Sequence, residues 1–115
     1  MVEFLAVAIL VVASLLGLAQ MAVWVWARGV AVSATHEGAR AAAEAGRSLD
    51  DGVARTRTLL RDGLGGSADG FRVESDEAEG VVAVVASGRA PVIVPFFPAF
   101  TVEARATAQD EDDVR

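Results

Sequence analysis

The sequence opens with a long apolar segment in which a single acid precedes an uninterrupted hydrophobic run. Glu3 stands before Phe4–Ala27, 24 residues that contain no charged side chain. As a helix, this run would be about 36 Å long, because an α-helix rises about 1.5 Å per residue. The hydrocarbon core of a bilayer is about 30 Å thick, so the run is long enough to cross it. The pattern therefore predicts that residues 1–27 form a hydrophobic transmembrane helix.

A cleaved signal peptide is the alternative interpretation of this segment. Residues 31–34, Ala-Val-Ser-Ala, imitate a cleavage site. However, the apolar run is longer than the hydrophobic part of a signal peptide, and it lacks the basic residues that precede one. Trp24 and Trp26 at its far end also suit the interface between membrane and water. These features favour a retained membrane helix.

The helical pattern continues beyond the apolar run. Residues 28–47 contain no proline and are rich in alanine, the strongest helix former. Charges of alternating sign recur at helical spacing and predict a ladder of ion pairs on one face, formed by Glu37, Arg40, Glu44 and Arg47.

A second face of the same helix carries mostly small residues. They are Val30, Ala34, Gly38, Ala41 and Ala45. Small residues let a neighbouring helix come close. We interpret this stripe as a packing face against copies of the chain or related subunits; the alternative is the modest core face of a solvated helix.

A second, shorter helix should follow. Residues 48–51, Ser-Leu-Asp-Asp, have the composition of a helix start, with an N-cap serine and acids in the first turn. An apolar stripe at helical spacing comes next, at Leu49, Val53, Leu60 and Leu64. We expect the glycines that follow to end this helix, namely Gly63, Gly65 and Gly66.

The pattern then changes from helical to alternating, which predicts a small antiparallel sheet. Residues 71–76 alternate between inward and charged positions, residues 76–80 predict a turn, and residues 81–87 form a valine-rich strand. The clearest period of two places the following residues on one face: Phe100, Val102, Ala104, Ala106 and Ala108. Because three strands alone are marginal in water, the helices should cover the apolar face. The fold class is therefore α+β, with one small domain at residues 28–108 and an acidic tail at 109–115.

The segment between the second and third strands has two open interpretations. Residues 91–100 contain all three prolines of the chain together with several aromatic and branched apolar residues. It is either a loop folded back to complete the core of a small domain, or an exposed patch for a partner subunit or the membrane surface.

Composition and charge exclude several function classes. Residues 28–115 carry ten arginines and 15 acids, a net charge of −5, whereas nucleic-acid binding needs a basic surface. There is no cysteine, and His36 is the only histidine. It neighbours Glu37 but lacks the convergent groups of a metal or catalytic site. We therefore expect no enzyme activity, cofactor, metal, small-molecule substrate or nucleic-acid partner.

Two short motifs and their separation resemble a known family. Val2-Glu3-Phe4 precedes the apolar run, and Glu37-Gly38-Ala39-Arg40 follows about a helix length later. This order resembles the TadE-like minor pilins, or pseudopilins, of the tight-adherence (type IVc) pilus system, and residues 101–108 (TVEARATA) are similar to that family's last strand. The related TadF-like pseudopilins are an alternative. The resemblance covers the chain well and implies a pilin-like layout: a long N-terminal helix, a short second helix and a three-stranded sheet.

The resemblance also implies a role and partners. The chain would be a minor subunit that primes, caps or stabilises a surface pilus used in adherence, working with other pilin or pseudopilin subunits, the pilus assembly platform and the membrane. Glu3 and Phe4 would be its assembly residues, with Glu3 pairing with the N-terminal amine of a neighbouring subunit. Residues 1–27 would then become the filament-core helix. Family precursors carry a basic leader that a prepilin peptidase removes.

The residues and the resemblance imply opposite orientations. Arginines after the span would place the domain in the cytoplasm under the positive-inside rule. The resemblance implies a single-pass cell-membrane protein with the domain outside, because the leader charges hold the N-terminus inside. We expect the extracytoplasmic orientation. The rival functions are a single-span envelope protein whose outer domain binds another membrane protein, and a membrane-tethered enzyme.

Overall fold

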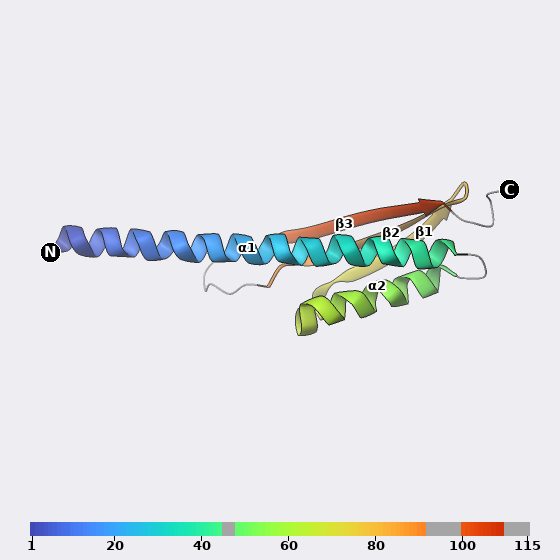
Figure 1. Ribbon diagram of the computed structural model, residues 1–115, viewed down its shortest axis with the longest axis horizontal. Coiled ribbons are helices and arrows are strands. Elements are labelled where there is room, and N and C mark those ends of the chain that lie inside the picture. The colour runs from blue at the N-terminus through green and yellow to red at the C-terminus, as the bar shows by residue number, and fades with distance from the viewer. Residues whose placement is uncertain (45–47, 92–99, 110–115) are drawn as a thin grey trace.

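The structure, a computed structural model, describes residues 1–44, 48–91 and 100–109. It contains two α-helices, one 3₁₀ segment and a three-stranded antiparallel sheet (Figure 1). The elements are α1 (Val2–Ala43), α2 (Leu49–Leu64), η1 (Gly65–Gly70), β1 (Arg72–Ala78), β2 (Val81–Arg89) and β3 (Thr101–Gln109). This arrangement confirms the predicted pilin-like α+β layout.

The long helix α1 runs without a break through the predicted membrane segment and into the domain. It ends at Ala43, because Glu44 adopts an extended backbone at φ −65° and ψ 144°. Its second half is buried by α2 and the sheet, whereas its first half projects beyond them (Figure 1). The molecule is therefore elongated, with extents of 74 × 23 × 16 Å.

The second helix begins where the sequence predicts. The Ser48 hydroxyl accepts a hydrogen bond from the Asp51 N–H at 3.3 Å, and the Asp51 carboxylate accepts one from the Ser48 N–H at 3.0 Å. This reciprocal capping box satisfies two N–H groups that the first helical turn leaves free. The helix ends at Leu64, and Gly65 follows with a φ of 61° that favours glycine.

Gly63 does not end α2, contrary to the prediction. It lies inside the helix, and a Cβ atom added there would be 2.6 Å from Cγ1 of Val30 on α1. Its role is therefore to let the two helices come close, and Gly65 alone supplies the cap conformation.

The sheet has the order β1-β2-β3, and its two pairings are antiparallel. One face is apolar and buried, and it includes Val73, Val82, Val84, Ala86, Val102, Ala104 and Ala106. The helix α1 packs on β2 and β3, and α2 packs on β1. Helices thus cover the apolar face as expected, and the core lies between them and the sheet.

The turn between β1 and β2 is shorter than the predicted turn at residues 76–80. Asp76 pairs with Ala83 and Ala78 with Val81, so only Glu79 and Gly80 connect the strands. Both residues have positive φ, 53° and 78°. That combination is typical of a two-residue type I′ turn, whose twist matches the strands. The acidic residues before it belong to the strand.

The third strand confirms the predicted period of two but shifts its ends. Val102, Ala104 and Ala106 are buried, whereas Phe100 precedes the strand and is 41% exposed. The predicted inward position of Phe100 is wrong, because this residue lies beyond the covered part of the sheet, beside Met21 and Trp24 of α1. Gln109 still belongs to β3. Residues 92–99 of the proline-rich segment and residues 110–115 of the tail lie outside the described residues.

Candidate functional site

The first half of α1 is the largest exposed apolar surface of the described chain. From Val2 to Ala19 no residue is buried, and the first buried residue is Gln20. These 18 residues project about 27 Å, given a rise of about 1.5 Å per residue. Within the described ranges, α1 is the helix long and apolar enough to cross a membrane.

The apolar surface extends around the whole helix. Exposed large hydrophobic residues include Leu5, Val7, Ile9, Leu10, Val11, Val12, Leu15, Leu16 and Leu18. These positions cover all sides of a helix with 3.6 residues per turn. A helix that is apolar on every side requires an apolar environment, either lipid or other protein.

Glu3 and Phe4 lie at the tip of this projecting helix, in its first turn. Both side chains are exposed, and no basic residue of the described chain forms a salt bridge with Glu3. An acid in this position interacts favourably with the positive end of the helix dipole. The two predicted assembly residues therefore lie together, far from the domain and available to a partner.

Two side chains join α1 to one end of the sheet, the end at which β2 finishes and β3 begins. This is the end nearest the projecting helix, and we call it the lower end (Figure 1). Gln20 is fully buried, and its Nε2 donates a hydrogen bond to the Pro91 carbonyl at 2.9 Å. One turn later, Nε1 of Trp24 donates to the Thr101 carbonyl at 3.0 Å. The domain therefore packs against α1 from Gln20 onward. The freely projecting segment is shorter than the predicted span of residues 4–27.

Sequence reasoning did not select Gln20 as a site residue. The available signal was one amide in a run, Phe4–Ala27, whose only other polar side chain is Ser14; this amide stands four residues before a tryptophan and therefore on the same face. Its acceptor is a backbone carbonyl 71 residues away, which no local pattern identifies.

The predicted small-residue stripe meets α2 of the same chain. A Cβ atom on Gly38 would lie 2.8 Å from the Gly52 carbonyl oxygen, and one on Gly52 would lie 2.7 Å from the Gly38 oxygen. The two glycines thus allow close contact between the helix backbones. Ala34 is buried and Val30 contacts Gly63 of α2, Ala41 is half-buried, and Ala45 lies outside the described residues.

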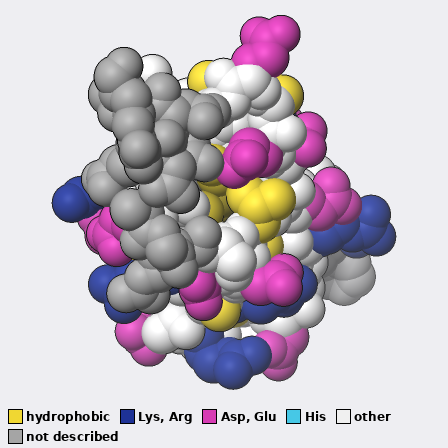
Figure 2. Space-filling model, turned by 90° about the vertical axis from the view of Figure 1, so that its right-hand side faces the viewer, with side chains coloured by type: hydrophobic (Ala, Val, Ile, Leu, Met, Phe, Trp, Pro, Cys, Tyr) yellow, Lys and Arg dark blue, Asp and Glu magenta, His cyan; other side chains and the backbone are white. Residues whose placement is uncertain are grey.

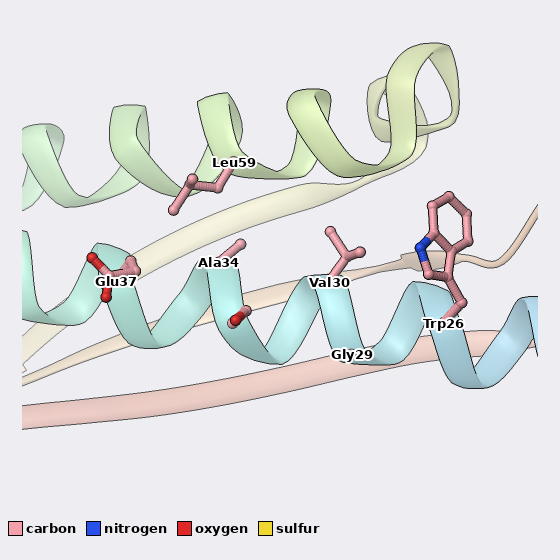
Figure 3. Close-up of a pocket in the computed structure, with 7 residues that line it drawn as sticks. Trp26, Gly29, Val30, Ala34, Glu37 and Leu59 are labelled. Atoms are coloured by element: carbon pink, nitrogen blue, oxygen red, sulfur yellow. The ribbon is translucent and has the colours of Figure 1, made fainter.

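An apolar groove of about 440 Å³ opens between α1 and α2 near the base of the domain. Trp26, Val30 and Leu59 border it, and Figure 3 shows Val30 and Leu59 on opposing helices. Gly29 lies on its floor, and an added Cβ atom there would meet nothing within 4 Å. The groove is therefore open to solvent, unlike the closed contact around Gly38.

Among the residues that the structure describes, Glu37 and Arg40 form a pair of the predicted ion-pair ladder. Nη1 of Arg40 lies 3.1 Å from Oε1 of Glu37, with side chains 73% and 45% exposed. Glu44 is the C-cap of α1, and Arg47 lies outside the described residues. An exposed pair of this kind contributes at most about 1 kcal/mol.

The described residues bring few polar side chains together in a way that could form a metal-binding or catalytic site. They contain no group of three or more His, Cys, Asp or Glu side chains that could hold a metal ion. His36 is exposed on α1. The main feature of the described structure is a projecting apolar helix with one acid at its tip. The same helix continues into a small domain.

No family model, curated protein or solved structure matches this chain. The geometry of the projecting helix and the resemblance of the sequence motifs are therefore the two sources of a functional proposal.

Proposed function

We propose that this chain is a minor pilin or pseudopilin that takes part in assembling a tight-adherence (type IVc) surface pilus, where it primes, caps or stabilises the filament. The observation that carries the proposal is the shape of α1. Apart from Glu3 and Ser14, its first 18 residues are apolar, and they project about 27 Å from a domain that packs against the rest of the helix.

A helix of this kind suits two environments in turn. In the membrane, its exposed side chains contact lipid, and its backbone groups are satisfied within the helix. In a filament, the same side chains would pack against the corresponding helices of neighbouring subunits. The domain would then lie on the outside of the filament, extracytoplasmic in both states.

Glu3 is the charged residue through which neighbouring subunits would interact in this proposal. A charge in a low-dielectric helix bundle is costly unless a partner of opposite charge is present. The N-terminal amine of an adjacent subunit is such a partner, and its position would set the axial register of the incoming helix. Glu3 is exposed at the tip of α1 and has no salt bridge in the described structure, which supports this role.

A single-span envelope protein is the second candidate. The open groove bordered by Trp26, Val30 and Leu59 favours it, because an exposed apolar groove on the domain suits another membrane protein. In that case the chain would stay in the membrane and never enter a filament.

Fractionation of cells that make the chain tests the proposal. Surface fibres are sheared off, and the chain is quantified in the fibre and membrane fractions, in parallel with a strain from which its gene is deleted. The proposal predicts the chain in both fractions and fewer fibres in the deletion strain. A chain confined to membranes, with unchanged fibres in the deletion strain, would favour the second candidate.

A further inference from the structure

The base of the domain, where the sheet meets α1, carries exposed apolar side chains that continue the surface of the projecting helix. We propose that this base, formed around Met21, Trp24 and Phe100, is embedded in the lipid headgroup interface, so that the domain lies directly on the bilayer. The inference rests on the membrane anchoring proposed above and goes beyond it by assigning a lipid-binding surface on the domain itself.

The length of the free helix is the first observation. Glu3 and Gln20, the polar residues that bound the apolar surface, are 17 residues apart, or about 26 Å along the helix axis. A hydrocarbon core is about 30 Å thick. If Glu3 lies at one interface, Gln20 therefore lies within about 4 Å of the other. No free stretch of helix then separates the membrane from the domain.

Hydrogen bonds attach the sheet to α1 at this level. Gln20 and Trp24 bind the Pro91 and Thr101 carbonyls at 2.9 and 3.0 Å, one turn apart on α1. The N–H of Ala90 donates to the Phe100 carbonyl at 2.9 Å and closes the lower end of the β2–β3 pair. The base of the sheet therefore lies beside residues 20–24 of α1. Where these residues reach the membrane interface, the base of the sheet reaches it too.

The exposed side chains at this height are apolar or amphipathic. Met21 is 59% exposed and Phe100 is 41% exposed, and together with Trp24 they line a shallow apolar depression of about 250 Å³. Trp26, two residues further along α1, is also exposed. Aromatic rings at one level are typical of a membrane–water interface.

The charges along the long axis suit this placement, because arginines lie near the base of the domain and acids gather at its opposite end. Arg28 follows Trp26 on α1, and Arg72 and Arg89 lie at the lower ends of β1 and β2; all three are exposed and form no salt bridge within the described ranges. Arg61 and Asp69, also near this end, lie 3.7 Å apart and offset each other, and Asp62 on α2 and Glu103 on β3 add two acids.

The opposite end of the domain is acidic. Acids cluster at the end of α1, the start of α2 and the β1–β2 turn, at Glu44, Asp50, Asp51, Asp76, Glu77 and Glu79. Figure 2 views the molecule from this end and shows acidic side chains spread over it, with arginines among them. Arginines near the base can donate hydrogen bonds to lipid phosphates, and the acids are kept away from an anionic surface.

Site-directed spin labelling measures the depth of each position. The chain contains no cysteine, so single-cysteine variants of the full chain need no background substitution. Phe100→Cys reports on the base, and Val81→Cys is the matched control, because its side chain is 42% exposed at the far end of the same sheet. Leu10→Cys reports on the middle of the free helix. Each labelled chain is reconstituted in vesicles of equal parts phosphatidylethanolamine and phosphatidylglycerol.

Collision of the label with oxygen, which prefers lipid, is compared with collision with a water-soluble nickel complex. We expect the oxygen-to-nickel ratio at Phe100 to exceed that at Val81 several-fold and to stay below that at Leu10. A ratio at Phe100 equal to that at Val81 overturns the proposal, as does a Phe100 label shielded from both reagents, which would indicate contact with protein. A low ratio at Leu10 would instead contradict the membrane anchoring. Met21→Cys repeats the measurement if the Phe100 variant does not fold.

Discussion

At the scale of single residues, glycines decide how closely the two helices pack. Gly38 and Gly52 face each other so closely that a Cβ atom on either would lie within 2.8 Å of the other's carbonyl oxygen. Gly29, on the same helix, has open space around it. Gly38 therefore lies in a tight helix contact and Gly29 does not, so the two glycines are a matched pair for mutation.

Gly38→Ala should destabilise the domain, because the added methyl group forces α1 and α2 apart. Overpacking of this kind costs about 1–3 kcal/mol. Gly29→Ala should leave stability unchanged or raise it by up to about 1 kcal/mol, since alanine is the better helix former. Thermal unfolding followed by circular dichroism in detergent checks both. Equal melting temperatures for the two variants would show that the glycine contact is not tight.

Gln20 is the second residue whose surroundings set its role. Gln20→Leu should destabilise the attachment of the sheet to α1, because the Pro91 carbonyl, at a partly buried site, loses its donor, a loss worth at most about 1–3 kcal/mol. Trp24→Phe is the comparison: it removes a hydrogen bond at a more exposed site, and we expect a smaller effect. The free energy of unfolding in detergent is the measurement. A Gln20→Leu chain as stable as the wild type would contradict the proposed role of this bond.

At the scale of elements, the sequence predicts most of the structure where local rules act alone. Ser48 starts α2 because its cap is made by residues three positions away, and β3 follows a simple alternation of apolar and polar residues. The extent of the β1–β2 turn was predicted wrongly, because an acid-rich segment has low strand propensity. Pairing with the buried strand β2 overrides that propensity.

The helix contacts show what the sequence alone leaves open. A stripe of small residues predicts close packing but does not say whether the partner is the same chain or another. In the structure, Gly38 meets α2, and Gly63, predicted as a helix stop, meets Val30. Likewise, the acceptors of Gln20 and Trp24 are backbone carbonyls 71 and 77 residues away, and carbonyls carry no residue-specific signal.

The β1–β2 turn yields a prediction at this scale. Glu79 has a φ of 53°, a left-handed conformation that is unfavourable for most side chains but tolerated by asparagine. Glu79→Asn creates the Asn-Gly pair preferred in type I′ turns and should raise stability by up to about 1 kcal/mol, because asparagine tolerates the left-handed conformation better than glutamate. Glu79→Val should lower it, because a β-branched residue fits this conformation poorly. Denaturant unfolding distinguishes the variants, and a Val variant as stable as the Asn variant would exclude the turn type described here.

At the scale of the whole molecule, α1 combines two surfaces in one rigid element. Its second half forms part of the core of the domain, and its first half is apolar, exposed and projecting (Figure 1). The two halves form one continuous helix, from Val2 to Ala43. This geometry underlies the proposal of a subunit that is drawn from the membrane into a filament.

The assembly role of Glu3 tests this account most directly. Glu3→Ala and Glu3→Gln are compared with the wild type by quantifying the chain in membranes and in sheared surface fibres. We expect normal levels of both variants in membranes, since removing a charge does not weaken insertion, together with a strong loss of both from fibres. If both variants enter fibres as efficiently as the wild type, the proposed pairing of Glu3 with a neighbouring subunit is contradicted.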